Sequence, residues 1–376
     1  MTPGRTARGA GRATARDAAP AVRPIEHVQG ASVVIGGRRL VSFGGCDYLG
    51  LAKHDDVVAA AHAGLDFFGA SASASRTTIG TMEPHVVLER TLADYFGTRA
   101  AIHFAAGWLA PQAAARALAP ECDAVLLDGG VHPALDDAAT LTGLPVRRYR
   151  HLDAADARRL AGKDRILVLT DGTPRPLRAL AALVERNRGH LVVDDAHGVG
   201  VLGPLGRGAL ELTGVSGRRV HLTGSLSKAF GSAGGFVVGS PAFIEKVRAR
   251  AAVVAGATPL SPAAAAAAEC ALQLAAGVEL RVLLWRNVAR LRRHLKGLGI
   301  RLPRERTPWF ALGAALPPSA VATWSRALDA RGFLVPSVTY YGDPQGTYLK
   351  VTVTALHTAA EIDALAAALA ASMPAA

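Results

Sequence analysis

The sequence predicts an α/β fold in which helices cover a mostly parallel sheet, with a smaller α+β domain at the C-terminal end. Short, mostly apolar runs recur between residues 100 and 239, and amphipathic stretches such as Val86 to Phe96 and Leu177 to Asn187 separate many of them. This alternation is typical of a parallel sheet covered by helices. After about residue 280 the pattern changes to one long helix followed by shorter strands. The strands expected in the large sheet are 100–104, 124–127, 146–149, 165–170, 190–194, 220–223 and 235–239.

Four segments are expected along the chain of 376 residues. Residues 1–24 form a basic leader, and residues 25–55 form an N-terminal segment that packs on the small domain. Residues 56–279 form the large domain, and residues 280–376 form the small one; a chain of this length can bury a core in each. In the small domain we expect helices at 280–298 and 358–373 and strands at 309–312 and 348–353.

The formal net charge of +12 comes mostly from arginine. Five arginines stand against one acid, Asp17, in the first 23 residues, among Ala, Gly, Pro and Thr. This composition indicates a disordered tail, with an organelle transit peptide or a nucleic-acid-binding arm as alternatives. A secretory signal is not expected, because the stretch has no apolar core. With 5% aromatic residues and no recognised binding motif, the chain is expected to bind no nucleic acid.

Composition favours a soluble, cytoplasmic enzyme. Half of the residues are hydrophobic, as in packed globular proteins. The longest alanine-rich tract, Pro262 to Gly277, is interrupted by Glu269 and Gln273. It falls short of the roughly 20 apolar residues that span a bilayer, so no membrane segment is expected. The three cysteines have no CxxC spacing, which favours a reducing compartment.

The strongest functional signal is Lys228, which lies in the stretch Thr223 to Gly231 downstream of an apolar strand ending at Asp194. A lysine on a small-residue loop, combined with an acid at a strand end, is what a pyridoxal 5'-phosphate (PLP) enzyme requires. The lysine would form a Schiff base with the cofactor, and the acid would keep the pyridine nitrogen protonated. Burial would also allow the neutral amine to act as a base.

Three further loops at strand ends add candidate residues. Gly107 and Trp108 open a helix whose free N–H groups and dipole suit a phosphate. His132 could stack on the pyridine ring, although spacing alone favours a surface histidine. His197 could donate to the phenolic oxygen of the cofactor. An ion pair is the alternative role for Asp194, and a metal site is not expected because no second cluster with metal-ligand spacing lies nearby.

These motifs together resemble the α-oxoamine synthases, a family of fold-type-I PLP enzymes that includes 8-amino-7-oxononanoate synthase and 2-amino-3-ketobutyrate CoA ligase, with this chain as a divergent member. The resemblance runs from about Arg39 to the C-terminal helix and implies a mostly parallel, seven-stranded type of sheet. The matching stretches are Cys46-Asp-Tyr-Leu-Gly-Leu51, Ser75-Arg76, Gly80-Thr81 ahead of His85, Gly107-Trp108, His132, Asp194-Asp-Ala-His197, Ser225-Leu-Ser-Lys-Ala-Phe-Gly231, Thr258-Pro-Leu-Ser-Pro262 and Leu349-Lys-Val-Thr-Val-Thr-Ala-Leu-His357.

The resemblance implies a homodimer with a shared active site and a role for each matching residue. Lys228 would be the Schiff-base lysine and Asp194 the partner of the pyridine nitrogen. The implied catalytic residues are Lys228, His132, His197 and Asp194. The implied cofactor-binding residues are Gly107, Trp108, His132, Asp171, Asp194, His197, Ser225, Lys228 and, from a second subunit, Thr258. The implied substrate-binding residues are Cys46, Ser75, His85 and Lys350.

The reaction implied by the resemblance joins an amino acid to an acyl thioester, carried by CoA or by an acyl-carrier protein. Carbon dioxide is lost and an α-amino ketone is formed. An aminotransferase or carbon–carbon lyase of the same fold is the first alternative. A binding protein that has lost catalysis is the second, and the retention of the lysine, the aspartate and both histidines speaks against it.

Four departures from the family pattern indicate a rebuilt substrate pocket. The segment after Gly172 is shorter than in the family, so a serine that positions cofactor and acyl substrate has no counterpart. Lys350 stands where an arginine is expected to clamp the amino-acid carboxylate, and a lysine offers a point charge in place of a planar two-pronged donor. Cys46 replaces an asparagine, and Ser73-Ala74 replace a glycine pair. A divergent member with an unusual substrate is therefore expected.

Overall fold

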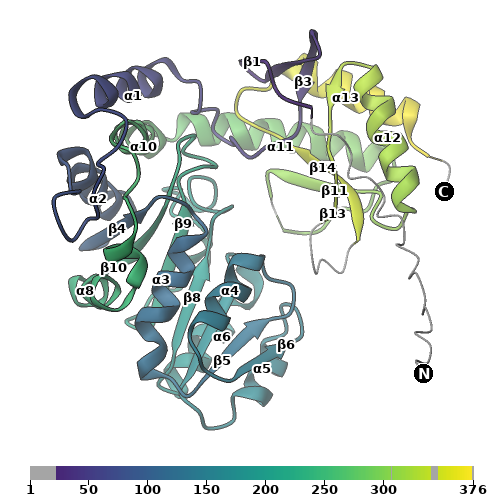
Figure 1. The fold of residues 1–376 in the computed structure, drawn as a ribbon. Helices are drawn as coiled ribbons and strands as arrows, with labels where there is room; N and C mark the ends of the chain where they lie inside the picture. The colour runs from purple at the N-terminus through teal and green to yellow at the C-terminus, as the bar shows by residue number, and fades with distance from the viewer. Residues whose placement is uncertain (1–22, 306, 340–345, 375–376) are drawn as a thin grey trace, which may run out of the picture.

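The computed structural model describes residues 23–305, 307–339 and 346–374, which form a large and a small unit (Figure 1). The expected leader, residues 1–24, lies outside the described residues except for Arg23 and Pro24. The guanidinium of Arg23 pairs with the carboxylate of Asp329 at 2.5 Å.

The large unit is built on a seven-stranded sheet in the order β4-β10-β9-β8-β7-β5-β6. Strand β10 runs antiparallel to both of its neighbours, and the other pairings are parallel. All seven runs predicted from the sequence are strands of this sheet, which confirms the expected mostly parallel architecture. The strands are β4 (Ala100–Phe104), β5 (Ala124–Asp128), β6 (Val146–Tyr149), β7 (Ile166–Asp171), β8 (His190–Asp194), β9 (Val220–Ser225) and β10 (Gly235–Gly239).

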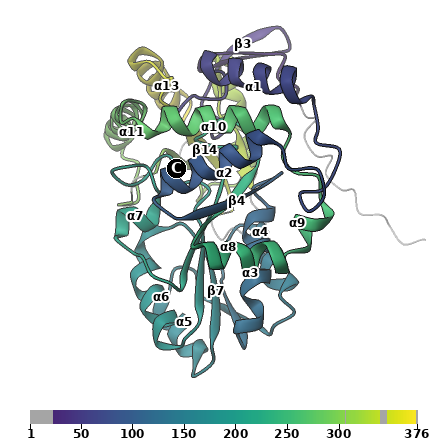
Figure 2. The same cartoon turned by 90° about the vertical axis from the view of Figure 1, so that its left-hand side faces the viewer.

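Helices cover both faces of the sheet (Figure 2). Alternate residues of the central strands face opposite ways, as the period of a strand requires. Leu169 and Val192 pack toward one set of helices, whereas Val168 and Val193 pack toward the other. The first set is α3 (Leu109–Leu118), which leads into a short 3-10 turn (Ala119–Glu121), α4 (Pro133–Leu141) and α8 (Pro241–Arg250); the second is α5 (Ala154–Ala161), α6 (Pro174–Arg186) and α7 (Ala209–Thr213).

A further layer of helices packs against strands β4, β10 and β9 on one face of the sheet, and the alanine-rich tract forms its centre (Figures 1 and 2). The helices of this layer are α1 (Asp55–Phe68), α2 (Glu83–Phe96) and α10 (Pro262–Ala276), whereas the short α9 (Ala252–Gly256) packs with α3 and α8 through Val254. A side chain at Gly64, in α1, would place its Cβ 2.9 Å from the Cα of Ala263, in α10, so the backbones of these two helices lie in contact. Small residues on both sides permit this approach, and Ala265, Ala268 and Ala271 are fully buried.

The small unit combines two small sheets with three helices, and α11 crosses the top of the molecule from α10 to reach it (Figure 1). The helices and strands expected here at 280–298, 309–312, 348–353 and 358–373 are present, with ends shifted by one residue at most. The elements are β1 (His27–Gln29), β2 (Ser32–Ile35), β3 (Arg38–Ser42), α11 (Glu279–Gly297), β11 (Trp309–Leu312), α12 (Pro318–Ala330), β12 (Phe333–Leu334), β13 (Ser337–Thr339), β14 (Thr347–Thr352) and α13 (Ala359–Ser372).

The N-terminal segment joins the small unit. Strand β3 pairs in parallel with β12, and the N–H groups of Thr352 and Ala355 donate to the carbonyls of Phe43 and Tyr48 at 2.7 and 2.8 Å. The β2–β3 hairpin turns through Gly36 and Gly37, which both have positive φ. One apolar cluster runs from Phe230 through Leu291 into the small unit, so the two units share a core. A domain boundary near residue 279 is therefore a proposal.

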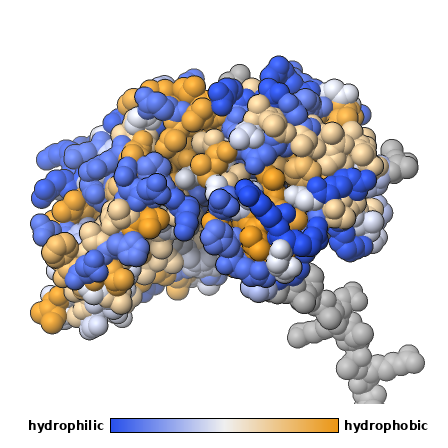
Figure 3. Space-filling model, turned by 90° about the horizontal axis from the view of Figure 1, so that it is seen from above, coloured by the Kyte–Doolittle hydropathy of each residue, from blue (hydrophilic) through white to orange (hydrophobic). Residues whose placement is uncertain are grey.

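The face of the molecule seen from above carries hydrophobic residues in separate patches among hydrophilic ones (Figure 3). The side chains of Phe67, on α1, and Ile79, in the loop before α2, are 83% and 87% exposed. Within the described residues, no helix has both the length and the apolar character needed to span a bilayer.

Candidate active site

The predicted site residues gather where β4, β5, β8 and β9 end, which is where parallel sheets place ligands. Asp194 ends β8, and Lys228 lies in the loop after β9. Gly107, His132 and His197 follow β4, β5 and β8. The residues come from four separate strand ends, so only the assembled sheet brings them together.

Asp194 is a buried carboxylate at the centre of this group. Asp194 is 9% exposed, and its carboxylate accepts a hydrogen bond of 2.8 Å from the hydroxyl of Thr223 on neighbouring β9. Burial raises the pKa of Asp194, while Thr223, Lys228 and His132 act to lower it. No ion pair to Asp194 is found among the described residues. A cationic group placed against this carboxylate would therefore be strongly stabilised.

The next residue, Asp195, has a different role although its side chain is also buried. Its carboxylate accepts from the backbone N–H of Ala209 at 2.5 Å. Side chains at Gly172 or Gly198 would collide with it, because their Cβ atoms would lie 2.0 and 2.1 Å from its Oδ1. Asp195 thus fixes the surrounding loops and faces away from the group around Asp194.

Lys228 is half-buried in a turn that is tightly packed against the N-terminal segment. Burial lowers the pKa of its amine, and the charge of Asp194 opposes the shift. The turn closes at Gly231, where φ is +59° and an added Cβ would lie 2.2 Å from the backbone nitrogen of Ala52. Only glycine fits there without strain. The lowered pKa makes the neutral amine of Lys228 more accessible at neutral pH.

His132 is held at the start of α4 by three contacts. Its backbone N–H donates to the carboxylate of Asp171 at 3.0 Å, and its Nδ1 accepts from the N–H of Ala134 at 3.2 Å. The indole of Trp108 meets its ring edge-on, with centroids 5.3 Å apart, and donates to Asp137 at 3.1 Å. Because Nδ1 accepts, the proton of the neutral ring lies on Nε2. Burial lowers the pKa of His132 and favours that neutral form.

Asp171 lies beside Asp194 in the β7–β8 register. Burial, followed by the charge of Asp194, raises its pKa to about 7. Directly after it, Gly172 packs on Asp195, and α6 begins at Pro174. The connection between β7 and α6 is therefore short and closely packed. Asp171 therefore acts on the site through the backbone of His132.

Two residues to which the sequence analysis gives no individual role also contact residues of the site. Tyr48 is fully buried, and its hydroxyl lies 2.6 Å from Nδ1 of His197. Ser227 shares a hydrogen bond of 2.8 Å with Ser225. Both stand inside motifs noted in the sequence. A single sequence does not show which hydroxyl groups will contact the site after folding, so neither residue could be given a role of its own.

Lys350 reaches the site from β14 of the small unit. It is 8% exposed, and its amine lies 5.7 Å from the centroid of the Trp309 ring. It is near enough to lower the pKa of both His197 and Lys228. Cys46, a half-buried free thiol, is also near enough to influence Lys228. The site therefore holds two lysine amines.

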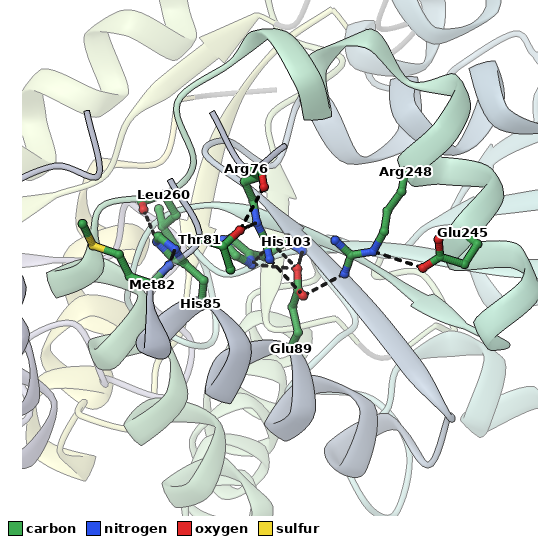
Figure 4. Close-up of polar contacts among 9 residues, drawn as sticks. All are labelled: Arg76, Thr81, Met82, His85, Glu89, His103, Glu245, Arg248 and Leu260. Carbon is green, nitrogen blue, oxygen red and sulfur yellow. Dashed lines mark hydrogen bonds and ion pairs between the residues drawn. The ribbon is translucent and has the colours of Figure 1, made fainter. Parts of the chain in front are cut away.

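Ser75, His85 and Thr258 lie apart from this group. Ser75 contacts Thr77 within its own loop at 3.1 Å, and Thr258 is exposed between α9 and α10. His85 is fully buried; its Nδ1 accepts from the N–H of Met82 at 3.1 Å, and its Nε2 donates to the carbonyl of Leu260 at 2.7 Å (Figure 4). Both of its ring nitrogens are thus occupied, so we assign His85 a structural role instead of the expected substrate contact.

Beside His85, a buried ionic cluster ties the loop before α2 to the sheet (Figure 4). Glu89, on α2, forms ion pairs with Arg76 and Arg248 and accepts from the backbone N–H of His103 at 3.1 Å. The side chains of Arg76 and Glu89 are 7% and 11% exposed. The cluster holds Arg76, and with it Ser75, in one conformation.

Glu89→Gln is expected to lower the free energy of unfolding by about 3–5 kcal/mol, because it leaves buried guanidinium charge unpaired. The pKa of Glu89 lies below its ordinary value of 4.5, so its stabilisation is present above that pH and is lost as pH falls below it. Urea unfolding followed by circular dichroism at pH 7 measures the difference. The matched control is Glu245→Gln, since Glu245 is 74% exposed in its pair with Arg248; it should change stability by under about 1 kcal/mol.

Comparison with known proteins identifies the family. The family model for aminotransferase class I and II matches residues 38–369. An 8-amino-7-oxononanoate synthase of Thioalkalivibrio sulfidiphilus is 39% identical over 364 residues, covering 93% of this chain and 93% of the relative. The chain belongs to the aminotransferase class I and II family. Another 8-amino-7-oxononanoate synthase, from Anaeromyxobacter dehalogenans, is 38% identical over 94% of this chain and 91% of its own length.

Solved structures place the chain in the same branch. A serine palmitoyltransferase from S. paucimobilis, solved with a bound PLP–myriocin aldimine, superposes with a TM-score of 0.87 at 29% identity, over 93% of this chain and 92% of that chain. A serine palmitoyltransferase from Sphingomonas wittichii gives 0.87 at 26% identity, over 94% and 92%. The resemblance to PLP-dependent α-oxoamine synthases of fold type I is thereby confirmed.

The residues of this aminotransferase-family chain fit PLP. The N–H groups of Gly107 and Trp108 have no acceptor among the described residues, and they stand at the start of α3, where a phosphate is favoured. A Cβ at Gly107 would lie 2.9 Å from Oγ of Ser225, so the phosphate cradle admits no side chain there. At the other end of the site, the buried carboxylate of Asp194 suits a protonated pyridine nitrogen.

Proposed function

We propose that this α-oxoamine synthase condenses an amino acid with an acyl thioester, releasing carbon dioxide and a thiol and forming an α-amino ketone. The observation that carries the proposal is that the Lys228 amine lies near enough to the buried carboxylate of Asp194 for each to shift the pKa of the other, in a chain of this family. PLP, when bound, supplies an electron-withdrawing ring next to the α-carbon of the amino acid.

The residues of this chain then divide the work. Asp194 would hold a proton on the ring nitrogen and so keep the ring electron-withdrawing. Lys228, with its lowered pKa, takes the α-proton. His132, neutral and fixed at the start of α4, would lie against one face of the bound cofactor. Gly107, Trp108 and Ser225 bind the phosphate and so fix the position of the reacting carbon.

Lys350 is proposed to bind the carboxylate of the amino acid. It is the second amine of the site, and the first, Lys228, is assigned to the cofactor and the α-proton. Because both His132 and His197 have lowered pKa values, they add no positive charge at neutral pH. The ammonium group of Lys350 is therefore proposed to supply the positive charge that binds an incoming carboxylate.

Lys350→Met is expected to raise KM for the amino acid about 10- to 100-fold and to change kcat much less, because it removes one charge-assisted contact to the substrate. Steady-state kinetics with the acyl donor saturating measure both constants. Lys296→Met, at an exposed lysine on α11, is the control and should leave both unchanged. Equal losses in kcat and kcat/KM with an unchanged KM would contradict the role.

The acyl donor and amino acid are identified by one experiment. The purified protein, loaded with PLP, is incubated with a panel of amino acids against acyl-CoAs and acyl-carrier proteins, and products are analysed by mass spectrometry. Release of carbon dioxide and free thiol in equal amounts, with an α-amino ketone, supports the condensation. Formation of a keto acid, with the cofactor left in its amine form, would instead establish the aminotransferase alternative.

The protein is proposed to act as a cytoplasmic homodimer with an active site shared between subunits. Phe67 and Ile79 leave large apolar side chains exposed on α1 and the following loop, where a second copy could cover them. Thr258 is exposed and makes no described contact with the site of its own chain, so it is free to contribute to that of the partner. Sedimentation equilibrium tests the dimer.

A further inference from the structure

We propose that Tyr48 is a positioning residue that fixes the tautomer of His197, so that its Nε2–H faces the reacting groups. The proposal rests on the proposed function, because it concerns the same site. The decisive contact is the 2.6 Å separation between the Tyr48 hydroxyl and Nδ1 of His197. The two rings are tilted by 54° with centroids 6.1 Å apart, so they meet through these polar atoms and not by stacking.

The tautomer follows from the chemistry of the two groups. His197 lies in the mouth of the site, where solvent reaches its ring, yet the surrounding protein and the charges of Lys228 and Lys350 lower its pKa well below 6.5. The imidazole is therefore neutral and carries one proton. A phenol O–H is a better donor than a neutral imidazole N–H, and an imidazole nitrogen is a better acceptor than a phenol oxygen. Tyr48 therefore donates to Nδ1, and the ring proton lies on Nε2.

The backbone around Tyr48 holds the hydroxyl in place. The Asp47 carboxylate accepts from the N–H groups of Leu51 and Ala52 at 2.9 and 3.2 Å, which closes the turn that carries Tyr48. The carbonyl of Tyr48 accepts from the N–H of Ala355 at 2.8 Å. The tyrosine is thus anchored to the N-terminal segment and to the small unit at once. Its full burial leaves the ring no room to turn away from His197.

A fixed Nε2–H makes His197 a hydrogen-bond donor toward any oxygen that carries negative charge in the site. Complete loss of one such donor typically lowers kcat by 10²–10³-fold. Without Tyr48 the ring would still be present but would divide between two tautomers. We therefore expect Tyr48→Phe to lower kcat by about tenfold, with KM for the amino acid nearly unchanged, since the contact to the carboxylate is elsewhere.

The tautomer itself is the direct test. The full-length protein is labelled with ¹⁵N-histidine, and long-range ¹H–¹⁵N spectra identify which ring nitrogen of His197 carries the proton. The signals of His197 are assigned by their disappearance in His197→Gln. We expect the wild type to show protonation at Nε2 alone and Tyr48→Phe to show a mixture of both forms.

The matched control is Tyr95→Phe, which removes another largely buried hydroxyl, bonded to the Gly206 carbonyl at 3.3 Å outside the site. It should leave the His197 signals and kcat unchanged. A proton on Nδ1 in the wild type overturns the proposal without any variant, even if Tyr48→Phe fails to fold. Identical His197 spectra in wild type and Tyr48→Phe would overturn it as well. The spectra need no turnover, so failure of the condensation reaction would be seen separately.

Discussion

Lys228→Ala is expected to lower the rate of condensation by about 10³–10⁴-fold, since one amine both anchors the cofactor and moves the α-proton. It should also abolish covalent retention of PLP. Treatment of the wild type with PLP and borohydride should add the reduced pyridoxyl group to the peptide that contains Lys228. In Lys228→Ala the corresponding peptide should keep its unmodified mass, and cofactor should be lost on dialysis.

The control for Lys228→Ala is Lys246→Ala. Lys246 forms a partly exposed ion pair with Glu121 at 2.7 Å on α8, away from the strand ends that build the site. Its replacement should leave labelling and turnover intact. If the label appeared on a different lysine, or if Lys228→Ala kept more than a tenth of wild-type activity, the assignment of the site would be wrong.

Asp194→Asn is expected to lower kcat by about 10²–10³-fold, because an amide cannot hold the proton on the ring nitrogen. Its effect on the stability of the cofactor-free protein should have the opposite sign. Burial raises the pKa of Asp194 above 3.8, so the folded state disfavours the ionised form, and stability is lost as pH rises through that range. Removing the charge should therefore leave the cofactor-free variant as stable as the wild type, or more stable, at pH 7.

The effect of Asp194→Asn on kcat and its effect on the stability of the cofactor-free protein separate catalysis from folding. Thermal unfolding without PLP measures stability, and absorbance titration with PLP measures cofactor affinity. Thr223→Val is the milder comparison, since it removes the hydroxyl that donates to Asp194 but keeps the carboxylate. A cofactor-free Asp194→Asn that unfolds well below the wild type would show that the carboxylate has a structural partner other than the cofactor.

Much of the large unit could be predicted because its strands are short, apolar and separated by amphipathic helices. The N-terminal strands β1 to β3 were not predicted individually. The strand β1 is exposed at every residue, so its sequence lacks the alternation that marks a half-buried strand. Its pairing with β2 depends on the turn near Gly30 and not on burial.

The site was predicted unevenly, for reasons that differ from residue to residue. Asp194 and Lys228 belong to motifs whose chemistry is specific to one cofactor, and the structure brings them together. His85 belongs to a motif as well, but its ring faces into the protein toward Leu260. Ser75 and Thr258 remain proposals, because their placement in the site requires a second chain.

The sequence by itself determined the class of fold, the family and the chemistry centred on Lys228, because local periodicity and short motifs are properties of neighbouring residues. The tertiary structure shows why the adjacent acids Asp194 and Asp195 differ in their contacts. Successive residues at a strand end point in opposite directions, so one carboxylate meets Thr223 and the other meets the backbone of Ala209. Contacts across long stretches of chain, such as the one between Tyr48 and His197, exist only once the units have packed against each other.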